Sequence, residues 1–413
     1  MVNPMTLRTV NSMYCAGTIR KSRIEPSTMK NIIPHISLLE ACHIWTRNSS
    51  TRSFRERLYR LMMFKLGQGE GTEKWVEKHY IHNLFLILSI ISFGCIQKIP
   101  AQGMNLSGLE RTWNKSLDLT SQVKSINEQI TFLYEKDYKI YRLPLDIDFL
   151  LSTDKQVLKK KMNILIKLTK KKKVNLVFAY FNHDLTQDNY KQRAKEIAAN
   201  WLQLLNLIKG NKDNLYIDLA NEPVIYPREW EEAASVIIGT IRDTYPDIKI
   251  IYGASNFNSM YELSRSRPLP YDNIIYAFHF YEPYIFTHQG TSWTGNQTAT
   301  VNIPFPYPGS APEKMPPLNK KAMGTQAEIN YRDYPSTGTC QAMDDKIALI
   351  HHWAQENNVE VWCTEYGVTI NADRESRIHY LKCVEQALNR YNIKGFVWEY
   401  EGNFEVKDIL FQD

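Results

Sequence analysis

The stretch Leu215-Tyr216-Ile217-Asp218-Leu219-Ala220-Asn221-Glu222-Pro223 decides the fold of this 413-residue chain. Its mostly apolar first six residues predict a buried strand. Asn221 and Glu222 follow where the strand must stop, because Pro223 has no amide hydrogen to give to a sheet. The stretch Val361-Trp362-Cys363-Thr364-Glu365-Tyr366-Gly367 repeats this arrangement. Each stretch therefore predicts a strand that holds a glutamate at its carboxyl end.

Short apolar runs alternate with longer helical patterns on both sides of these stretches, which is typical of parallel strands joined by crossover helices. Most of the runs are rich in Ile, Val, Tyr and Phe without strict alternation, as expected when both faces of a strand are covered. Eight strands are predicted, at Gly103–Leu109, Tyr138–Leu145, Asn175–Phe181, Leu215–Glu222, Ile248–Ala254, Ile274–Tyr281, Val359–Tyr366 and Ile393–Tyr400. Eight such units within residues 102–413 predict an α/β fold of the (β/α)8 TIM barrel class.

Apolar residues at helical spacing predict the connecting helices Asp154–Lys172, Gln187–Ile208, Arg228–Tyr245, Asp345–Asn357 and Arg374–Tyr391. Thirteen residues follow Tyr400, so we expect the final helix to be shortened or missing. The segment Glu282–Thr339 is rich in Pro, Tyr, Gly and Asn and is too long for an idle connection. It follows the carboxyl end of a strand, where barrel enzymes hold their active sites, so we expect it to form a wall of a substrate cleft.

The first hundred residues do not continue the barrel pattern. The run Leu84–Gly94 is apolar, follows several basic residues and ends at Cys95. It is too short to span a bilayer as a helix and is typical of an export signal, although a buried helix is the alternative. Cys95 resembles the lipid-attachment cysteine of bacterial lipoproteins, except that Ser92 stands where Leu is usual. We expect 76–101 to be an export signal, 1–75 to be an extension that is not translated naturally, and the protein to be secreted, periplasmic or anchored by lipid at the cell surface.

Charge and motifs exclude several classes of function. Residues 1–82 carry 13 Lys and Arg against 6 acidic residues, whereas the remainder carries 37 basic and 38 acidic residues. The near-neutral charge of this remainder gives no reason to expect a nucleic-acid partner. Neither glycine-rich nucleotide motif is present, and the six cysteines match no zinc spacing, so we expect no cofactor and no metal. Cys340 could pair with Cys363 or with Cys383, or all three could be buried free thiols.

The ends of the fourth and seventh strands face each other across the mouth of an eight-stranded barrel, so Glu222 and Glu365 are expected to meet there. Glycoside cleavage needs such a pair, with one protonated carboxyl for the leaving oxygen and one ionised carboxylate for the anomeric carbon. In retaining enzymes the two groups are roughly 5–5.5 Å apart. We predict that Glu222 is the acid/base and Glu365 the nucleophile. Glu399 and Glu401 follow Trp398 without a partner acid and are not expected to form the working pair.

Six motifs occur in order along the strands: Gly103-Met104-Asn105-Leu106-Ser107-Gly108, Tyr141-Arg142-Leu143-Pro144, Asn221-Glu222-Pro223, His279-Phe280-Tyr281-Glu282-Pro283, Thr364-Glu365-Tyr366-Gly367 and Trp398. By these motifs the chain resembles glycoside hydrolase family 5, the cellulase family of (β/α)8 glycosidases, from about Gly103 to Phe404. The resemblance implies a retaining endo-β-1,4-glucanase that degrades a β-1,4-linked plant polysaccharide. We expect the protein to be a monomer.

The resemblance also implies roles around the carboxylate pair. Arg142 is expected to lie beside Glu365 and keep it ionised through a charge-assisted hydrogen bond. Tyr281 is expected to donate a hydrogen bond to Glu365. His279 is expected near Glu222, where it tunes the acid. Each of these side chains could instead have a purely structural role in a salt bridge or in the core.

Further residues are expected to contact sugar. The resemblance implies that Asn221 binds the sugar 2-hydroxyl, a contact that strengthens in the transition state, and that Trp398 forms the floor under the reacting ring. Asn182 replaces the first histidine of a pair usual in the family, and His183 matches the second. Trp293 is either a stacking platform for a more distant sugar or an anchor of its own loop.

Other readings of the chain remain open at this point. A β-mannanase, a xyloglucanase and an exo-β-glucosidase share all of these motifs and differ in loops that one sequence does not decode. A non-catalytic carbohydrate-binding barrel is the alternative of another class. A protein that binds membranes through the basic residues 1–82 is a third alternative, and it is excluded if residues 1–75 are not translated.

Overall fold

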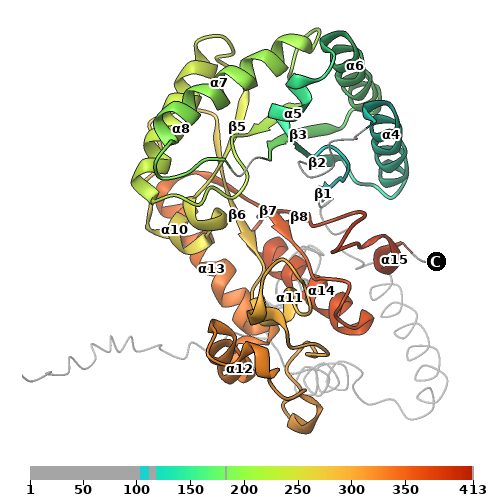
Figure 1. Ribbon diagram of the computed structural model, residues 1–413, viewed down its shortest axis with the longest axis vertical. Helices are drawn as coiled ribbons and strands as arrows, with labels where there is room; N and C mark the ends of the chain where they lie inside the picture. The colour runs from blue at the N-terminus through green and yellow to red at the C-terminus, as the bar shows by residue number, and fades with distance from the viewer. Residues whose placement is uncertain (1–102, 111–117, 182–183, 412–413) are drawn as a thin grey trace, which may run out of the picture. The chain divides into compact units, whose positions relative to one another are not determined.

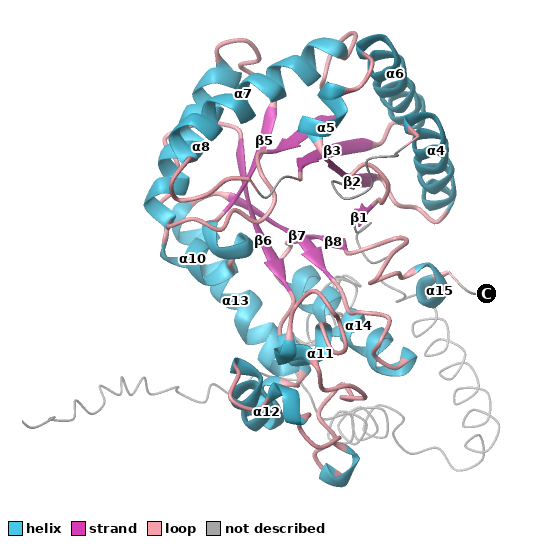
Figure 2. Cartoon of the chain, in the orientation of Figure 1, coloured by secondary structure: helices cyan, strands magenta, loops and turns pink. Residues whose placement is uncertain are grey.

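The structure is a computed structural model, and it describes residues 103–110, 118–181 and 184–411. Within these residues eight parallel strands close into one barrel in sequential order, with β1 beside both β2 and β8. Helices surround the strands (Figures 1 and 2). The predicted (β/α)8 TIM barrel is therefore confirmed. The expectations on 1–75, 76–101, Cys95, Asn182 and His183 lie outside the described residues.

Each of the eight predicted strands is present. They are β1 (Gly103–Asn105), β2 (Ile140–Leu145), β3 (Asn175–Tyr180), β4 (Leu215–Asp218), β5 (Lys249–Gly253), β6 (Ile274–Phe280), β7 (Glu360–Tyr366) and β8 (Lys394–Val397). Several are shorter than predicted at the carboxyl end. The chain beyond them still hydrogen-bonds to neighbouring strands, for example from the Leu219 amide to the Ile251 carbonyl, but without a regular ladder. Glu222 therefore lies beyond the end of β4, not on the strand as predicted.

The helices include all five that the sequence predicts. The structure has α4 (Leu119–Glu135), α5 (Ile147–Ser152), α6 (Lys155–Lys172), α7 (Tyr190–Leu207), α8 (Pro227–Arg242), α9 (Ser255–Asn258), α10 (Met260–Arg265), α11 (Tyr284–Thr287), α12 (Gln326–Thr337), α13 (Cys340–Asn357), α14 (Arg374–Arg390) and α15 (Lys407–Leu410). Helix α15 has four residues, in agreement with a shortened final helix. In the part of the chain that the structure describes, no helix combines the length and apolar character needed to cross a membrane.

Helix α4 was not predicted, although its signals are present. Asp118 caps it by accepting hydrogen bonds from the backbone amides of Thr120 and Ser121. Its buried side chains Val123, Ile126, Ile130 and Leu133 recur at helical spacing. Polar residues stand between these side chains, so the helical spacing is not obvious from the sequence alone.

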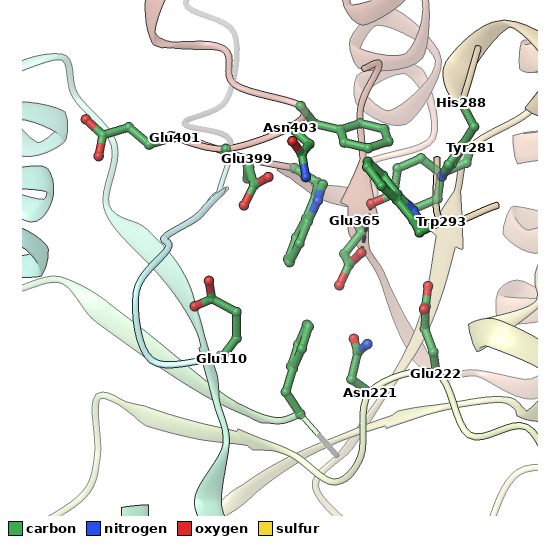
Figure 3. Close-up of a pocket in the computed structure, with 14 residues that line it drawn as sticks. Glu110, Asn221, Glu222, Tyr281, His288, Trp293, Glu365, Glu399, Glu401 and Asn403 are labelled. Atoms are coloured by element: carbon green, nitrogen blue, oxygen red, sulfur yellow. Dashed lines mark hydrogen bonds between the residues drawn. The ribbon is translucent and has the colours of Figure 1, made fainter. Parts of the chain in front are cut away.

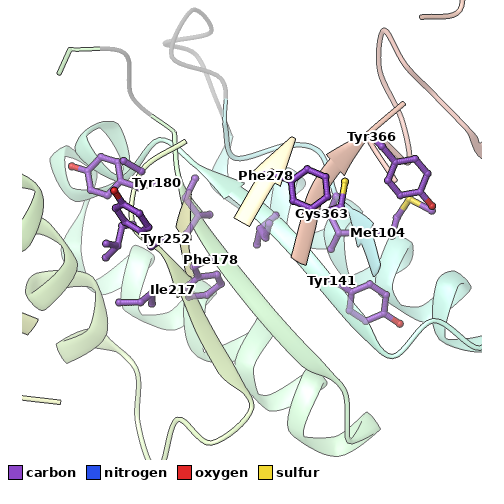
Figure 4. Close-up of a cluster of buried hydrophobic side chains, with 14 of the residues drawn as sticks. Met104, Tyr141, Phe178, Tyr180, Ile217, Tyr252, Phe278, Cys363 and Tyr366 are labelled. Atoms are coloured by element: carbon purple, nitrogen blue, oxygen red, sulfur yellow. The ribbon is translucent and has the colours of Figure 1, made fainter. Parts of the chain in front are cut away.

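Two apolar layers hold the barrel together. The interior layer takes side chains from seven strands: Ile140, Val177, Tyr216, Ile251, Ile275, Ala277, Trp362 and Phe396. Gly103 leaves room for this layer, since a Cβ atom there would lie 2.2 Å from the Phe396 ring. The outer layer packs strands against helices, and Figure 4 shows part of it around Tyr141, Phe178 and Phe278. Packing on both faces explains why the strand sequences do not alternate.

The long segment Glu282–Thr339 has structure of its own. It contains α11, α12 and the 3-10 turns Asn296–Thr298, Pro312–Lys314 and Lys320–Ala322. Only its first part reaches the carboxyl ends of the strands, so the expected wall of the cleft is formed by a minority of the segment.

The cysteine alternatives are resolved for the described residues. Cys340 at the start of α13 forms a disulfide with Cys383 of α14, and Cys363 on β7 is a buried free thiol. The disulfide joins two neighbouring outer helices on either side of β7.

Candidate active site

A cleft of about 620 Å³ opens at the carboxyl ends of the strands. Figure 3 shows the side chains that project into it from strand ends and loops. Its lining consists of Glu110, Phe181, Asn221, Glu222, Tyr281, His288, Trp293, Glu365, Trp398, Glu399, Glu401, Gly402, Asn403 and Phe404. Acids and aromatics dominate this lining, a combination suited to hydroxyl-rich ligands with flat apolar faces.

The two glutamates singled out from the sequence meet in this cleft. One carboxylate oxygen of Glu222, one of Glu365 and a ring nitrogen of His279 all lie within 4.8 Å of one another. These oxygens lie slightly nearer to each other than the roughly 5–5.5 Å that separates the carboxyl groups of retaining glycosidases, and far nearer than the roughly 6.5–9.5 Å of inverting enzymes. A water molecule therefore does not fit between them for direct attack.

A register shift in the barrel brings His279 to this position. Phe278 pairs with Cys363, but the next residue, His279, pairs with Glu365, so Thr364 is an extra residue in β7. Such bulges re-aim side chains beside functional sites. Here the bulge sets His279 of β6 directly opposite Glu365 of β7.

Glu365 is buried and held by two donors. Arg142 Nη1 lies 2.6 Å from its Oε1, and the Tyr281 hydroxyl donates to its Oε2 at 2.8 Å, so both expected contacts are present. Burial raises the pKa of the Glu365 carboxyl, and the positive charge of the Arg142 guanidinium opposes that rise. Both donors favour the charged form of Glu365.

Arg142 is itself fully buried, with no exposed surface. Its Nε donates to Asp218 Oδ2 at 2.9 Å, its Nη1 also donates to Asn105 Oδ1 at 3.0 Å, and its Nη2 donates to Asn221 Oδ1 at 2.9 Å. Asp218 and Asn105 were not predicted as site residues. A charged residue within an apolar strand was the available signal for Asp218, because a buried carboxylate needs a partner.

Glu222 has a different environment. Its Oε1 lies 2.7 Å from His279 Nδ1, and Asn258 Nδ2 lies 3.1 Å from His279 Nε2 on the far side of the ring. Burial lowers the pKa of His279 to about 4, so the imidazole is neutral at neutral pH. The backbone of Glu222 is left-handed, with φ 48°, a conformation that costs a non-glycine residue about 1 kcal/mol. Strain of this kind concentrates at functional sites.

Aromatic side chains line the rest of the cleft. The ring of Trp398 stacks on that of Phe181, with centroids 5.8 Å apart and planes 3° from parallel. Trp293 is 57% exposed and contacts Phe404. The exposed face of Trp293 is available for an apolar sugar face, although its contact with Phe404 also ties it to the loop after β8.

A group of three acids at the other end of the cleft was missed as part of the site. Figure 3 shows Glu110, Glu399 and Glu401 on one side and Glu222 on the other. Glu399 is buried, and the Ser107 hydroxyl lies 3.0 Å from its Oε2. Glu399 and Glu401 were expected only to lie outside the working pair. The structure places them in the cleft lining, because the chain after Trp398 turns back over the barrel mouth.

The burial of Glu399 predicts a pH-dependent stability. Burial raises the pKa of its carboxyl to about 8 from an ordinary value of 4.5. Between these values the folded protein keeps a proton that the unfolded chain releases, so the free energy of unfolding must fall as pH rises through this window. Glu399→Gln stays neutral and should flatten that fall. Denaturant unfolding of both proteins at several pH values between 5 and 8.5 measures how the free energy of unfolding changes with pH.

Glu401→Gln is the control, since Glu401 is half-exposed and pairs with Lys407 at 2.8 Å. It should keep the pH slope of the wild type. Equal slopes for the wild type and Glu399→Gln would show that Glu399 does not hold the extra proton.

Two groups of potential metal ligands occur among the described residues. One consists of Glu222, His279 and Glu365, and the other of Cys340, His379 and Cys383. In the second group Cys340 and Cys383 form a disulfide with each other, so neither has a thiolate to offer to a metal. The first is the carboxylate pair itself, whose oxygens already accept hydrogen bonds, and glycoside cleavage by two carboxyls needs no metal.

Comparisons with known proteins agree with this geometry. The model of the family "Cellulase (glycosyl hydrolase family 5)" matches residues 97–404. Endoglucanase 3 of Fibrobacter succinogenes is 29% identical over 308 residues, which are 67% of this chain and 46% of that protein. Endoglucanase C of Acetivibrio thermocellus is 30% identical over 212 residues, 50% of this chain and 60% of that protein. The chain thus spans about half the length of the curated relatives it matches.

Among solved structures, a hyperthermophilic endo-β-1,4-glucanase in complex with substrate superposes with a TM-score of 0.60 at 20% identity. The match covers 75% of this chain and 92% of that one. At this identity the likeness concerns the fold, and it supports the closed barrel described above.

Proposed function

The chain belongs to the cellulase family, glycosyl hydrolase family 5, and on this premise we propose that it is a retaining endo-β-1,4-glucanase. Three kinds of support converge on the proposal. The carboxyls of Glu222 and Glu365 lie within reach of one sugar ring. Arg142 and Tyr281 favour the charged form of Glu365, as a nucleophile needs, whereas Glu222 faces a neutral imidazole and can keep the proton that an acid needs. The two relatives described above, from Fibrobacter succinogenes and Acetivibrio thermocellus, are named endoglucanases.

In the first step Glu365 is the nucleophile. Its carboxylate attacks the anomeric carbon, the bond from that carbon to the leaving oxygen breaks, and Glu222 gives its proton to that oxygen. Two carboxyls this close do not both ionise readily. Arg142 and Tyr281 support charge on Glu365, whereas Glu222 faces a neutral imidazole, so the shared proton belongs on Glu222.

In the second step Glu222 acts as a base. It takes a proton from water, the oxygen of that water attacks the anomeric carbon, and the ester bond to Glu365 breaks. Two inversions leave the product with the configuration of the substrate. Asn221, whose Oδ1 accepts from Arg142, is oriented to offer its amide nitrogen to the sugar 2-hydroxyl, and Trp398 supports the ring.

The observation that carries the proposal is the carboxyl separation, with oxygens within 4.8 Å. The test is a reducing-sugar assay of the purified protein with carboxymethyl cellulose, glucomannan and xyloglucan, followed by NMR of the first product formed. We expect activity on carboxymethyl cellulose with a falling viscosity and an initial β-anomer. An initial α-anomer would refute the retaining mechanism.

Other outcomes identify the alternatives. Preference for glucomannan or xyloglucan assigns a different endo-acting enzyme of the same chemistry, and release of glucose alone assigns an exo-β-glucosidase. Binding to one polymer without hydrolysis of any would make the protein a carbohydrate-binding barrel.

We further propose that the protein is exported, with Cys95 as its site of lipid attachment and with a monomeric barrel at the cell surface. The support is the apolar run Leu84–Gly94 behind basic residues and the substrate class, because a polymeric glucan does not enter a cell. Amino-terminal sequencing and metabolic palmitate labelling of the native protein test it. A peptide from residues 20–60 in the mature protein, or labelling that survives Cys95→Ser, would overturn it.

A further inference from the structure

The amino ends of the strands lie on the face of the barrel opposite the catalytic cleft, and no step above uses this face. Helices α4 and α6 lie side by side (Figure 1), and each ends just before the strand that follows it, so their carboxyl ends lie at this face. Together with the loop after α7, these helix ends carry eight lysines: Lys136, Lys139, Lys170, Lys171, Lys172, Lys173, Lys209 and Lys212. We call these lysines the basic end.

The basic end has an excess of positive charge within a barrel that is close to neutral. Its lysines occupy segments 134–139, 169–174 and 208–214, which contain three acids, Glu135, Asp137 and Asp213. The chain after residue 82 carries 37 basic and 38 acidic residues in total, so this local excess reflects an uneven distribution of charge. Acids stand before the next strands, Asp247 before β5 and Asp272 before β6. The positive excess is therefore confined to the part of this face around β2, β3 and β4.

Direct contacts join the three segments into one surface. The ammonium groups of Lys139 and Lys172 both lie over the ring of Tyr134, at 4.0 Å and 4.3 Å from its centroid, which ties the end of α4 to the end of α6. Lys170 Nζ donates to the backbone oxygen of Asn211 at 2.6 Å and to its Oδ1 at 2.8 Å, which ties α6 to the loop after α7. The lysines are therefore held together on a continuous part of the barrel.

The positive charges of the basic end repel one another. Burial lowers the pKa of Lys212, and the positive charge of Lys170 lowers it further. Lys170, Lys171 and Lys172 lie in the last turn of α6, and Lys173 caps it. Successive helical residues point about 100° apart around the axis, so the dipole at the end of α6 attracts only some of these side chains. An anionic surface against this end would relieve the repulsion that remains.

The chain enters the barrel next to the basic end. Gly103 begins β1, and the next residue, Met104, pairs in parallel with Tyr141 of β2. Gly103 therefore lies beside the start of β2, which Lys139 precedes. Cys95 stands eight residues before Gly103 in the sequence. An extended chain spans at most about 3.3–3.6 Å per residue, so a lipid on Cys95 would hold a membrane surface within about 30 Å of this face.

We propose that the basic end docks on the surface of a bilayer that contains anionic phospholipids, so that the catalytic cleft faces away from the bilayer. Lysine ammonium groups near such a surface gain free energy from its negative potential. A lipid anchor alone would leave the barrel free to turn, whereas docking of the basic end fixes its orientation. The inference uses the proposed lipid attachment only to favour a membrane over a soluble polyanion, and it does not depend on hydrolysis.

The test is acetylation of lysines in full-length Cys95→Ser protein, which carries no lipid, followed by peptide mass spectrometry. Vesicles of phosphatidylglycerol and phosphatidylcholine in equal parts are compared with vesicles of phosphatidylcholine alone. The exposed lysines Lys171, Lys173 and Lys209 should react about threefold or more slowly with the anionic vesicles, and added salt should remove this protection. The readout is local to each lysine, so binding of the vesicles by the basic residues 1–82 does not imitate it.

Helix α6 supplies a matched control at its other end. Lys155, Lys159 and Lys160 are exposed near its amino end, on the side of the cleft, and should react equally fast with and without vesicles. A protein with Lys171→Gln, Lys173→Gln and Lys209→Gln should also lose the protection of Lys136. A protein with Lys155→Gln, Lys159→Gln and Lys160→Gln loses the same charge and should keep that protection.

Three results would overturn the inference. The first is equal reaction of the basic end and of the control lysines in the presence of anionic vesicles. The second is equal protection by both kinds of vesicle, because negative charge would then not be the cause. The third is protection by inorganic phosphate or by polygalacturonate without protection by vesicles, which would assign the basic end to a soluble anion. Failure of the protein to hydrolyse any glucan would overturn the proposed function and leave these outcomes unaffected.

Discussion

Glu365→Gln is expected to lose nearly all turnover on every β-glucoside tested, by a factor on the order of 10⁴ or more, as for the loss of a catalytic nucleophile elsewhere. The amide keeps the shape of the carboxylate, and its oxygen can still accept from Arg142, which lies 2.6 Å from Oε1 in the wild type. Its NH2 group, in the place of Oε2, can only donate, so there it would donate to the Tyr281 hydroxyl oxygen, which lies 2.8 Å from Oε2 in the wild type. It cannot form the ester with the anomeric carbon. Initial rates on an aryl β-cellobioside and on carboxymethyl cellulose measure the loss.

The leaving group should make no difference to this loss, because the nucleophile is needed whether or not the departing oxygen requires a proton. Glu365→Gly in the presence of azide gives a stereochemical control, since direct attack by azide inverts the anomeric centre and yields an α-glycosyl azide. Glu365→Gln with more than about 1% of wild-type turnover would contradict the nucleophile assignment.

The loss of turnover caused by Glu222→Ala should depend on the leaving group of the substrate. Turnover of carboxymethyl cellulose should fall about 10²–10⁴-fold, the usual contribution of general acid–base catalysis. An aryl β-cellobioside with an acidic phenol needs little protonation and should keep its first step. Its second step then lacks a base, so a burst of phenol followed by a slow steady state is expected in stopped-flow absorbance.

Added azide should accelerate that slow phase and give a β-glycosyl azide, because azide replaces the water that Glu222 would activate and attacks the intermediate with a second inversion. Glu231→Ala on the exposed face of α8 is the control for a glutamate-to-alanine change and should behave as the wild type. Equal losses of Glu222→Ala on carboxymethyl cellulose and on the aryl substrate would show that Glu222 is not the acid.

The fold was predictable because its signal is local and repeated. Each strand is an apolar run of a few residues, and each major helix shows a recurring apolar face, so pattern alone recovers eight strands and five helices. The predicted ends of the strands were less accurate than their existence. The run Leu215–Glu222 reads as one strand, yet the ladder stops at Asp218 and Glu222 turns left-handed with φ 48°.

The candidate site was predictable only in part. The two glutamates follow from their strand ends and from the order of the motifs, and the contacts of Arg142, Tyr281 and His279 are present in the structure. Asp218 and Asn258 were missed. Each acts through a neighbour that lies far away in the chain, and no spacing rule links Asp218 to Arg142 or Asn258 to His279.

The amino-acid sequence by itself determined the order of strands and helices and the placing of two glutamates at strand ends, since strand and helix periodicity depend on neighbours a few residues apart. Only the tertiary structure decided which distant groups face each carboxyl, that Cys340 pairs with Cys383, and that the chain after Trp398 returns acids to the cleft. The physical reason is that burial, charge separation and hydrogen bonding act through space, so they exist only once the barrel has closed.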